Sequence, residues 1–272
     1  MIIIKGVPKN LWVNLHKAYK LQMYLSQLML KAKVQAEALK NVIDTTSILV
    51  DEVKFRITPD GIYLTAVDPA HVGMIDLKLK KEAFEEYEAS ELELGIDLDK
   101  IKGILSLAAP KDIVSLSYEE GEKRLTVQIN NLTRKISLLD TTGMTDSKIP
   151  SLELPGKIIV NTNELSKGIK ASEAISDHIL ISADTENFEL VAEGDTDIVN
   201  LKLTKDALSL LECKETVKSL FSLDYFSDMI KVIKNENIVL YLGTDYPIKM
   251  EFDIAEGNGR AIYLLAPRIE SE

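Results

Sequence analysis

The chain has 272 residues, 46% hydrophobic and 28% charged, a balance typical of a folded globular protein and not of a disordered or fibrous one. Its formal net charge of -11 argues against a protein that coats nucleic acid with its whole surface, because phosphate binding depends on Lys and Arg. The single cysteine, Cys213, excludes an internal disulfide and a cysteine-based metal cluster, and fits a reducing compartment.

Residues 1–28 differ in kind from the rest of the chain. They contain lysines but no Asp or Glu, they hold the only tryptophan, Trp12, and their leucines recur at helical spacing. The uncharged stretch 21–30 is about half as long as a membrane-spanning helix, so we expect no membrane span. The basic, apolar and cleavage regions of a signal peptide do not follow one another here, so we do not interpret the segment as one. Two interpretations remain: an accessory helix, or a start codon assigned too early with Met29 as the functional start. We favour the second.

Short β-strand patterns are dense from residue 29 onward. Most alternate apolar and polar residues, and Gly, Asp or Pro interrupts several, so they indicate hairpins with one buried face. The clearest segments are VKFRITPDGIYLTAVD (53–68), VGMIDLKL (72–79), DIVSLSYEEGEKRLTVQI (112–129), HILISADTENFELVAE (178–193), DIVNLKLT (197–204) and NIVLYLGTDYPIKMEFDI (237–254). Four stretches have helical spacing instead, at about 36–46, 98–108, 163–176 and 223–234. The pattern predicts an α+β fold in which β-strands predominate.

These elements occur twice in the same order, about 125 residues apart. FRITPDGIYLTAVD parallels ILISADTENFELVAE, and GIDLDKIKGIL parallels FSLDYFSDMIKVI. We therefore expect two similar domains, 29–140 and 154–272. Residues 141–153 between them are rich in turn-forming residues, which indicates a connector on the surface.

Each expected helix has an apolar side and a side that carries lysine. The lysines are Lys40, Lys100, Lys102, Lys167, Lys170, Lys231 and Lys234. Taken alone, they fit ordinary solvated helix faces, because acidic residues accompany them. Their repetition in both halves of the chain favours a functional basic surface.

Catalytic patterns are absent from the sequence. The chain has three histidines, His16, His71 and His178, and no nucleophile elbow, zinc-binding HExxH, Walker-type loop or cysteine pair. His71 follows Asp68 by three residues, but Asp-Pro more naturally begins a turn than a catalytic dyad. We expect a protein that is not an enzyme and that has no cofactor and no metal site.

Three segments carry a family resemblance: GIYLTAVDPAHVGMIDLKL (61–79), LGIDLDKIKGILSLAAPKDIVSL (94–116) and YPIKMEFDIAEGNGRAIYLLAPRIESE (246–272). From Met29 to Glu272 the chain resembles the proliferating cell nuclear antigen family of DNA sliding clamps, most closely its archaeal members. The resemblance implies a homotrimeric ring in which helices line the hole and sheets form the outer wall. It also implies that double-stranded DNA is encircled without sequence specificity, which makes DNA polymerase processive.

The resemblance assigns roles to three groups of residues. The DNA-facing group is the set of seven helix lysines. The group that binds a partner peptide is Val67, His71, Val72, Met74, Ile149, Pro150, Pro247, Ala266, Pro267 and Arg268. The subunit interface would pair the edges Leu125–Asn131 and Thr196–Leu203, represented by Leu125, Val127, Ile129, Ile198, Asn200 and Lys202.

The implied partners are DNA polymerase, the clamp loader, the flap endonuclease and DNA ligase, each docking through a short peptide motif. The implied location is cytoplasmic, at an archaeal nucleoid, or nuclear in a eukaryote. One alternative stays open from the residues themselves: a β-rich oligomeric scaffold protein without a DNA role.

Overall fold

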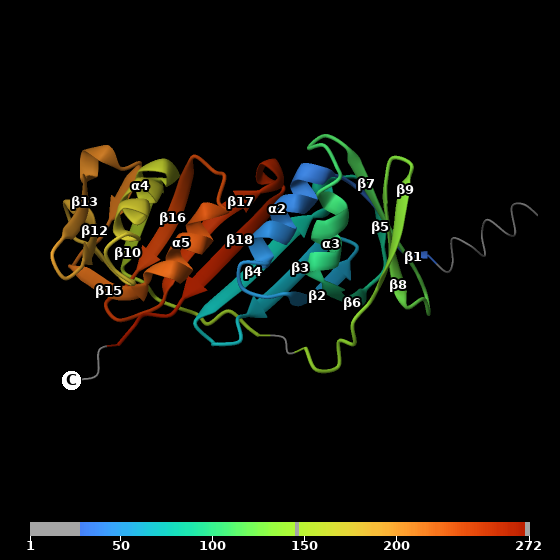
Figure 1. Ribbon diagram of the computed structural model, residues 1–272, viewed down its shortest axis with the longest axis horizontal. Coiled ribbons are helices and arrows are strands. Elements are labelled where there is room, and N and C mark those ends of the chain that lie inside the picture. Colours follow the sequence, from blue (N-terminus) through green and yellow to red (C-terminus); the bar gives the residue numbers. More distant parts are fainter. Residues whose placement is uncertain (1–27, 145–146, 270–272) are drawn as a thin grey trace, which may run out of the picture.

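The computed structural model describes residues 28–144 and 147–269, and within them the chain forms helices and antiparallel sheets (Figure 1). The α-helices are α2 (Ala36–Thr46), α3 (Leu98–Leu105), α4 (Thr162–Ser172) and α5 (Leu223–Lys231). The strands of the first half are β1 (Leu28–Gln35), β2 (Glu52–Thr58), β3 (Gly61–Val67), β4 (Gly73–Lys80), β5 (Phe84–Ala89), β6 (Leu92–Asp97), β7 (Ile113–Glu119), β8 (Arg124–Ile129) and β9 (Leu132–Ser137). Those of the second half are β10 (Gly156–Asn161), β11 (His178–Ala183), β12 (Asn187–Glu193), β13 (Ile198–Thr204), β14 (Leu210–Glu212), β15 (Val217–Ser222), β16 (Asn237–Leu242), β17 (Ile248–Ile254) and β18 (Gly259–Leu265). Short 3-10 helices are η1 (Lys81–Ala83), η2 (Lys205–Ala207) and η3 (Ala255–Gly257).

The element order confirms the internal repeat that the sequence predicted. Each half runs strand, helix, three strands, 3-10 helix, two strands, helix and two strands, and then ends in one further strand, β9 or β18, the latter preceded by η3. Four strands lead directly into the four α-helices, β1 into α2, β6 into α3, β10 into α4 and β15 into α5. The two halves therefore have the same architecture, and β9 and β4 of the first half correspond to β18 and β13 of the second.

Three sheets form one layer of the molecule, and the α-helices form the other. A nine-stranded sheet, β14-β10-β16-β17-β18-β4-β3-β2-β6, contains strands from both halves, which join where β18 pairs with β4. A five-stranded sheet, β5-β1-β7-β8-β9, and a four-stranded sheet, β13-β12-β11-β15, lie at the two ends. The long axis thus ends in two open edges, β9 and β13.

The four α-helices lie on the same side of these sheets (Figure 1). Each buries one apolar side, because its hydrophobic residues recur three and four positions apart. In α2 this side is Leu39, Val42 and Ile43, each 2% exposed or less, and the hydroxyl of Tyr263 on β18 donates to the carbonyl oxygen of Thr45. The helices are thereby fixed on the sheets with their polar sides outward.

The hairpin between β2 and β3 depends on a glycine. Gly61 has φ +145°, and a Cβ placed on it would lie 2.2 Å from the carbonyl oxygen of Leu79. Only glycine combines this backbone angle with so close an approach to the neighbouring strand. The glycine in the sequence TPDGIY is therefore a structural requirement of this sheet.

Candidate nucleic-acid interface and peptide-docking site

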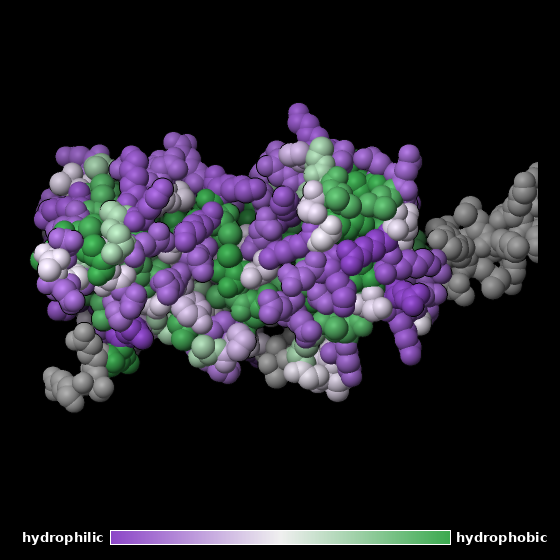
Figure 2. Space-filling view, in the orientation of Figure 1, coloured by the Kyte–Doolittle hydropathy of each residue, from purple (hydrophilic) through white to green (hydrophobic). Residues whose placement is uncertain are grey.

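The seven predicted DNA-facing lysines lie on the helix side of the molecule. Six belong to α2, α3, α4 and α5, and Lys234 follows the end of α5 by three residues. The Nζ atom of Lys234 donates to Oδ1 of Asn41 on α2 at 2.7 Å, which joins the helices of the two halves. Hydrophilic side chains cover most of this face (Figure 2).

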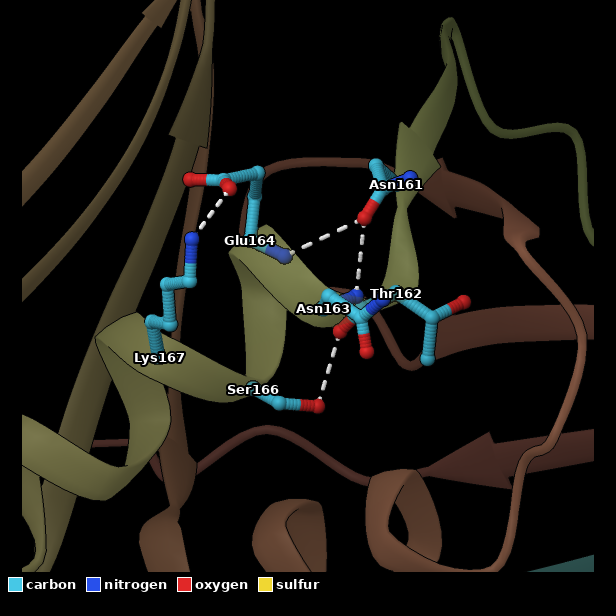
Figure 3. Close-up of polar contacts among 6 residues, drawn as sticks. All are labelled: Asn161, Thr162, Asn163, Glu164, Ser166 and Lys167. Atoms are coloured by element: carbon cyan, nitrogen blue, oxygen red, sulfur yellow. Dashed lines mark hydrogen bonds and ion pairs between the residues drawn. The ribbon is translucent and has the colours of Figure 1, made fainter.

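The start of α4 shows how the local sequence positions a lysine (Figure 3). Oδ1 of Asn161, the N-cap residue, accepts hydrogen bonds from the amides of Asn163 and Glu164, at 3.0 and 3.3 Å. Glu164, in the first helical turn, is favoured there by the helix dipole. Its Oε1 lies 2.6 Å from Nζ of Lys167, one turn later. The cap thus fixes the helix start, and the acid in the first turn holds the lysine that follows it.

Several of these lysines are paired with acids. Nζ of Lys100 lies 2.7 Å from Oδ2 of Asp97, and Nζ of Lys231 lies 3.0 Å from Oε1 of Glu173. The hydrogen bond with Glu173 raises the pKa of Lys231 above its ordinary value, so this side chain stays charged. Lys40, Lys102 and Lys170 form no ion pair with any described residue. The helix side therefore carries two kinds of lysine: three without an ion pair to a described residue, and others whose charge a neighbouring acid compensates.

A second site lies where β3, β4, β17 and β18 reach the same end of the nine-stranded sheet. Val67 pairs with Met74, which pairs in turn with Leu264, so these side chains share one cross-strand row. The amide of Ala266 donates to the carbonyl oxygen of Val72 at 2.8 Å. The strand pairing therefore gathers the apolar side chains at one place.

The remaining predicted peptide-binding residues surround this row. Pro247 directly precedes β17, and Pro267 follows Ala266; both are half-buried. Arg268 is exposed, and its amide donates to the carbonyl oxygen of Leu220 at 2.7 Å. Ile149 and Pro150 lie on the connector, and no hydrogen bond within the described residues joins them to the strand ends.

Asp68 organises the loop between β3 and β4. Its carboxylate is 3% exposed and accepts hydrogen bonds from the amides of Ala70, Val72 and Gly73, at 3.0, 2.7 and 2.5 Å. The hydroxyl of Tyr225, on α5, donates to the same carboxylate at 2.8 Å. His71 is exposed, has φ 58°, and shares no hydrogen bond with this carboxylate. The loop thus holds an exposed histidine beside the apolar row and no catalytic dyad.

Two residues of this site were not predicted from the sequence. Leu264, which is 6% exposed, lies in β18, and its apolar side chain looked like an ordinary core residue of that strand. Tyr225 lies in a helical pattern whose spacing gave no sign of a partner in the other half of the chain. Only the strand register and the helix placement reveal either role.

The predicted subunit edge of the first half is wrong. The family resemblance placed it on Leu125–Asn131, but β8 lies between β7 and β9, and Leu125, Val127 and Ile129 are 3%, 0% and 4% exposed. The edge strand beside β8 is β9, whose Leu132 is 46% exposed. In the second half the segment named for the interface, Thr196–Leu203, includes β13, which is an edge strand of its sheet, and Ile198 there is 69% exposed. Asn200 and Lys202 on the same strand are also exposed.

Two kinds of feature are absent from the described ranges. No helix in them is long and apolar enough to span a membrane. Among the same residues no cluster of three His, Cys, Asp or Glu could hold a metal ion. The predictions for residues 1–27 lie outside the described part of the chain.

Comparison with known proteins identifies the family. Residues 29–146 match the model of the proliferating cell nuclear antigen N-terminal domain, and residues 148–268 match that of its C-terminal domain. Curated relatives named DNA polymerase sliding clamp include those of Methanococcoides burtonii, 48% identical, and Methanocella arvoryzae, 46% identical. Each alignment covers 90% of this chain and all of the relative. The chain belongs to the proliferating cell nuclear antigen family.

Solved structures agree with this assignment. The Archaeoglobus fulgidus antigen with the C-terminal region of FEN-1 bound has 34% identity and a TM-score of 0.85 over 90% of this chain and all of that one. The Thermococcus kodakaraensis antigen has 28% identity and a TM-score of 0.82 over 88% of this chain and all of that one. The predicted fold class, α+β with two similar halves in a DNA clamp arrangement, is confirmed.

Proposed function

We propose that this chain is the subunit of a DNA sliding clamp, which encircles duplex DNA and tethers DNA polymerase and other replication and repair enzymes to it. The observation that carries the proposal is the internal repeat, because it leaves two complementary open edges on one chain. The family is a non-catalytic one, which agrees with the prediction that the protein is not an enzyme.

Ring closure follows from the repeat by a simple correspondence. Within the chain β18 pairs with β4 across the junction of the two halves. Their counterparts are β9 and β13, and each of these is an edge strand of its own sheet in the described chain. A β9 edge of one subunit can therefore pair with the β13 edge of the next as β18 pairs with β4. Such a contact is heterologous, because it joins two different surfaces, and repeated rotation closes it into a ring. Three chains, each with two similar halves, make a ring of six similar domains.

The repeat also predicts the register of this pairing. Matching the halves strand by strand through the observed pairs places Thr133 opposite Asn200 of the next subunit and Arg134 opposite its Val199. The exposed side chains of Leu132 and Ile198 lie on these edges and would become covered. Burial of both would contribute to ring stability.

The helix side would line the hole of this ring. The lysines without an ion pair to a described residue, Lys40, Lys102 and Lys170, would meet the DNA phosphates, and Lys100, Lys167, Lys231 and Lys234 would add a field that their polar partners weaken. Weak, sequence-independent attraction suits a protein that must slide, because tight phosphate contacts would stop movement. The topology of the ring, and not its affinity, then retains the DNA.

The strand-end site would receive the partners. The apolar row of Val67, Met74 and Leu264, with the segment Ala266 and Pro267 beside it, suits a peptide that brings apolar anchors and pairs its main chain. One solved relative has the C-terminal region of FEN-1 bound, which supports a flap endonuclease among the partners. DNA polymerase, the clamp loader and DNA ligase would use the same site. The relatives are archaeal, so we place the protein in the cytoplasm, at the nucleoid.

Primer extension tests this function. On a primed circular single-stranded template, cognate polymerase and loader should make long products only when the protein is present. Unchanged product length with and without it would contradict the proposal. A variant with Met74→Ala and Ala266→Asp should lose the stimulation while keeping its ring mass, because it removes the docking site alone.

A further inference from the structure

The loop between β3 and β4 is fastened to the second half of the chain by a side-chain hydrogen bond. Of the four donors to the buried Asp68 carboxylate, three are amides of the loop itself and one is the hydroxyl of Tyr225. Tyr225 lies 157 positions later in the sequence, in the first turn of α5. A buried charge with four donors is well satisfied, so this arrangement is specific.

Packing brings the same loop close to α5. A Cβ placed on Gly73 would lie 3.1 Å from Cε of Met229, on α5, and 2.6 Å from Cδ2 of Leu49. Glycine at this position therefore lets the loop backbone approach the helix. The loop lies against α5 on one side and is bonded to Ala266 on the other.

The conformation of the loop requires such support. His71 has φ 58°, a left-handed angle that costs a non-glycine residue free energy and persists only where the surroundings hold it. The amide of His71 donates to the carbonyl oxygen of Asp68 at 3.0 Å, and the Asp68 carboxylate bonds the residues on either side of it. Loss of an anchor at Asp68 would therefore loosen His71 and Val72 together.

We propose that Asp68 and Tyr225 are positioning residues for partner-peptide docking, and that their hydrogen bond holds the 68–73 loop against α5 in the form that binds the peptide. This inference rests on the proposed function, because it takes the strand-end row as the docking site. Asp68 is buried and does not touch the peptide. A loop that is already ordered binds more tightly than one that must be ordered on binding, since the entropic cost is removed beforehand.

Tyr225→Phe isolates the effect, because it deletes one hydroxyl and keeps the ring. The probe is a synthetic peptide with the pattern Gln-x-x-aliphatic-x-x-aromatic-aromatic. We expect its Kd to rise about tenfold, the loss typical of one hydrogen bond to a charged group. Hydrogen–deuterium exchange of the segment 68–73 should become faster in the free protein. Ring mass by light scattering and retention on circular duplex DNA should stay unchanged, which a general loss of structure would not allow.

Tyr246→Phe is the matched control. Tyr246 directly precedes Pro247, is 56% exposed, and its hydroxyl bonds no described residue. Its replacement should change neither the Kd nor the exchange. Asp68→Asn should weaken peptide binding at least as much as Tyr225→Phe does, since it removes the negative charge that all four donors contact.

The outcomes separate this inference from the proposed function. If the wild-type protein binds the peptide and Tyr225→Phe leaves the Kd unchanged, the inference is overturned but the proposed function is not. A raised Kd without faster exchange at 68–73, or with a lower ring mass, overturns it as well. No binding of the peptide by the wild-type protein overturns the docking site itself, and the inference with it.

Discussion

At the residue scale, the Asp68 carboxyl combines burial with strong hydrogen bonding. Burial alone would raise its pKa, but the donors Gly73, Tyr225, Ala70 and Val72 outweigh burial and hold the pKa below its ordinary value. A carboxyl with a lowered pKa in the folded state stabilises the fold above the pKa of the unfolded state. This stabilisation disappears as the pH falls through the folded-state pKa.

Asp68→Asn should therefore destabilise the protein in a pH-dependent way. We expect the difference in free energy of unfolding between wild type and variant to be largest above about pH 5. It should shrink as the pH falls below about 4, where the carboxyl of the unfolded state protonates, and disappear as the pH falls through the lower pKa of the folded state. Urea unfolding at pH 7 and at pH 3 measures it. Asp195→Asn, in an exposed loop, is the control. An equal difference at both pH values would contradict this account of Asp68.

Two glycines with positive φ, Gly61 and Gly121, should differ in how much stability is lost when each is replaced by alanine. Gly61→Ala places a Cβ 2.2 Å from a backbone oxygen, whereas Gly121, at φ +78°, has open space around it. We expect Gly61→Ala to cost about 3 kcal/mol or more, through strain and displacement of the neighbouring strand, and Gly121→Ala about 1 kcal/mol. Urea unfolding gives both values. Equal losses would mean that the close approach to Leu79 has no consequence.

At the scale of elements, the sequence predicted those with strong periodicity. The six alternating segments became β2, β3, β4, β7, β8, β11, β12, β13, β16 and β17. All four helical stretches were predicted, although three end early: α3 at Leu105 and α5 at Lys231, each three residues before its predicted end, and α4 at Ser172, four residues before. Periodicity sufficed wherever one side of an element is buried.

The missed strand β9 explains the wrong edge. In LTRKIS only Ile136 is buried, so no alternation of apolar and polar residues marks the segment as a strand. Edge strands commonly carry charged and polar side chains, because these discourage pairing with the wrong chain. The sequence of such a strand therefore resembles that of a loop. Without β9, β8 was the last strand predicted in the first half, and the interface edge that the family resemblance implies was matched to it. The docking row was predicted from the resemblance, but the tie to Tyr225 depends on a contact that no local pattern encodes.

A disulfide can test the predicted contact between edges. Residues directly opposite each other in an antiparallel pair have Cα atoms about 4.5–5.5 Å apart, within the range of a disulfide. Thr133→Cys combined with Asn200→Cys should therefore give covalent rings under mild oxidation, seen as trimers on a non-reducing gel. Thr133→Cys with Thr204→Cys shifts one partner four residues along β13 and should not cross-link. Equal cross-linking of both pairs, or none of the first, would contradict the register.

At the scale of the whole molecule, the helix lysines and the net charge have to be considered together. An acidic chain with net charge -11 carries its helix lysines on one side of the sheets. Retention by topology requires only weak attraction there, so a negative net charge and a DNA-binding function are compatible. The net charge alone could not have predicted this, because it averages over the whole chain.

The salt dependence of DNA binding follows from the position of these lysines. Replacing Lys40, Lys102 and Lys170 by Ala should flatten the slope of log affinity against log salt for a linear duplex, by up to about 0.9 for each phosphate that is no longer neutralised. Fluorescence anisotropy at several salt concentrations measures the slope. The control replaces Lys78, Lys123 and Lys214, exposed lysines outside the helices, and should leave the slope unchanged. Equal flattening in both variants would place the DNA elsewhere.

Retention on closed DNA tests encirclement most directly. The protein is loaded on a circular duplex with the cognate clamp loader, free protein is removed by gel filtration, and half of the sample is linearised with a restriction enzyme. We predict that the protein stays with the circle and dissociates from the linear molecule, because it slides off the free ends. Equal retention on both forms would mean ordinary binding and would contradict the ring.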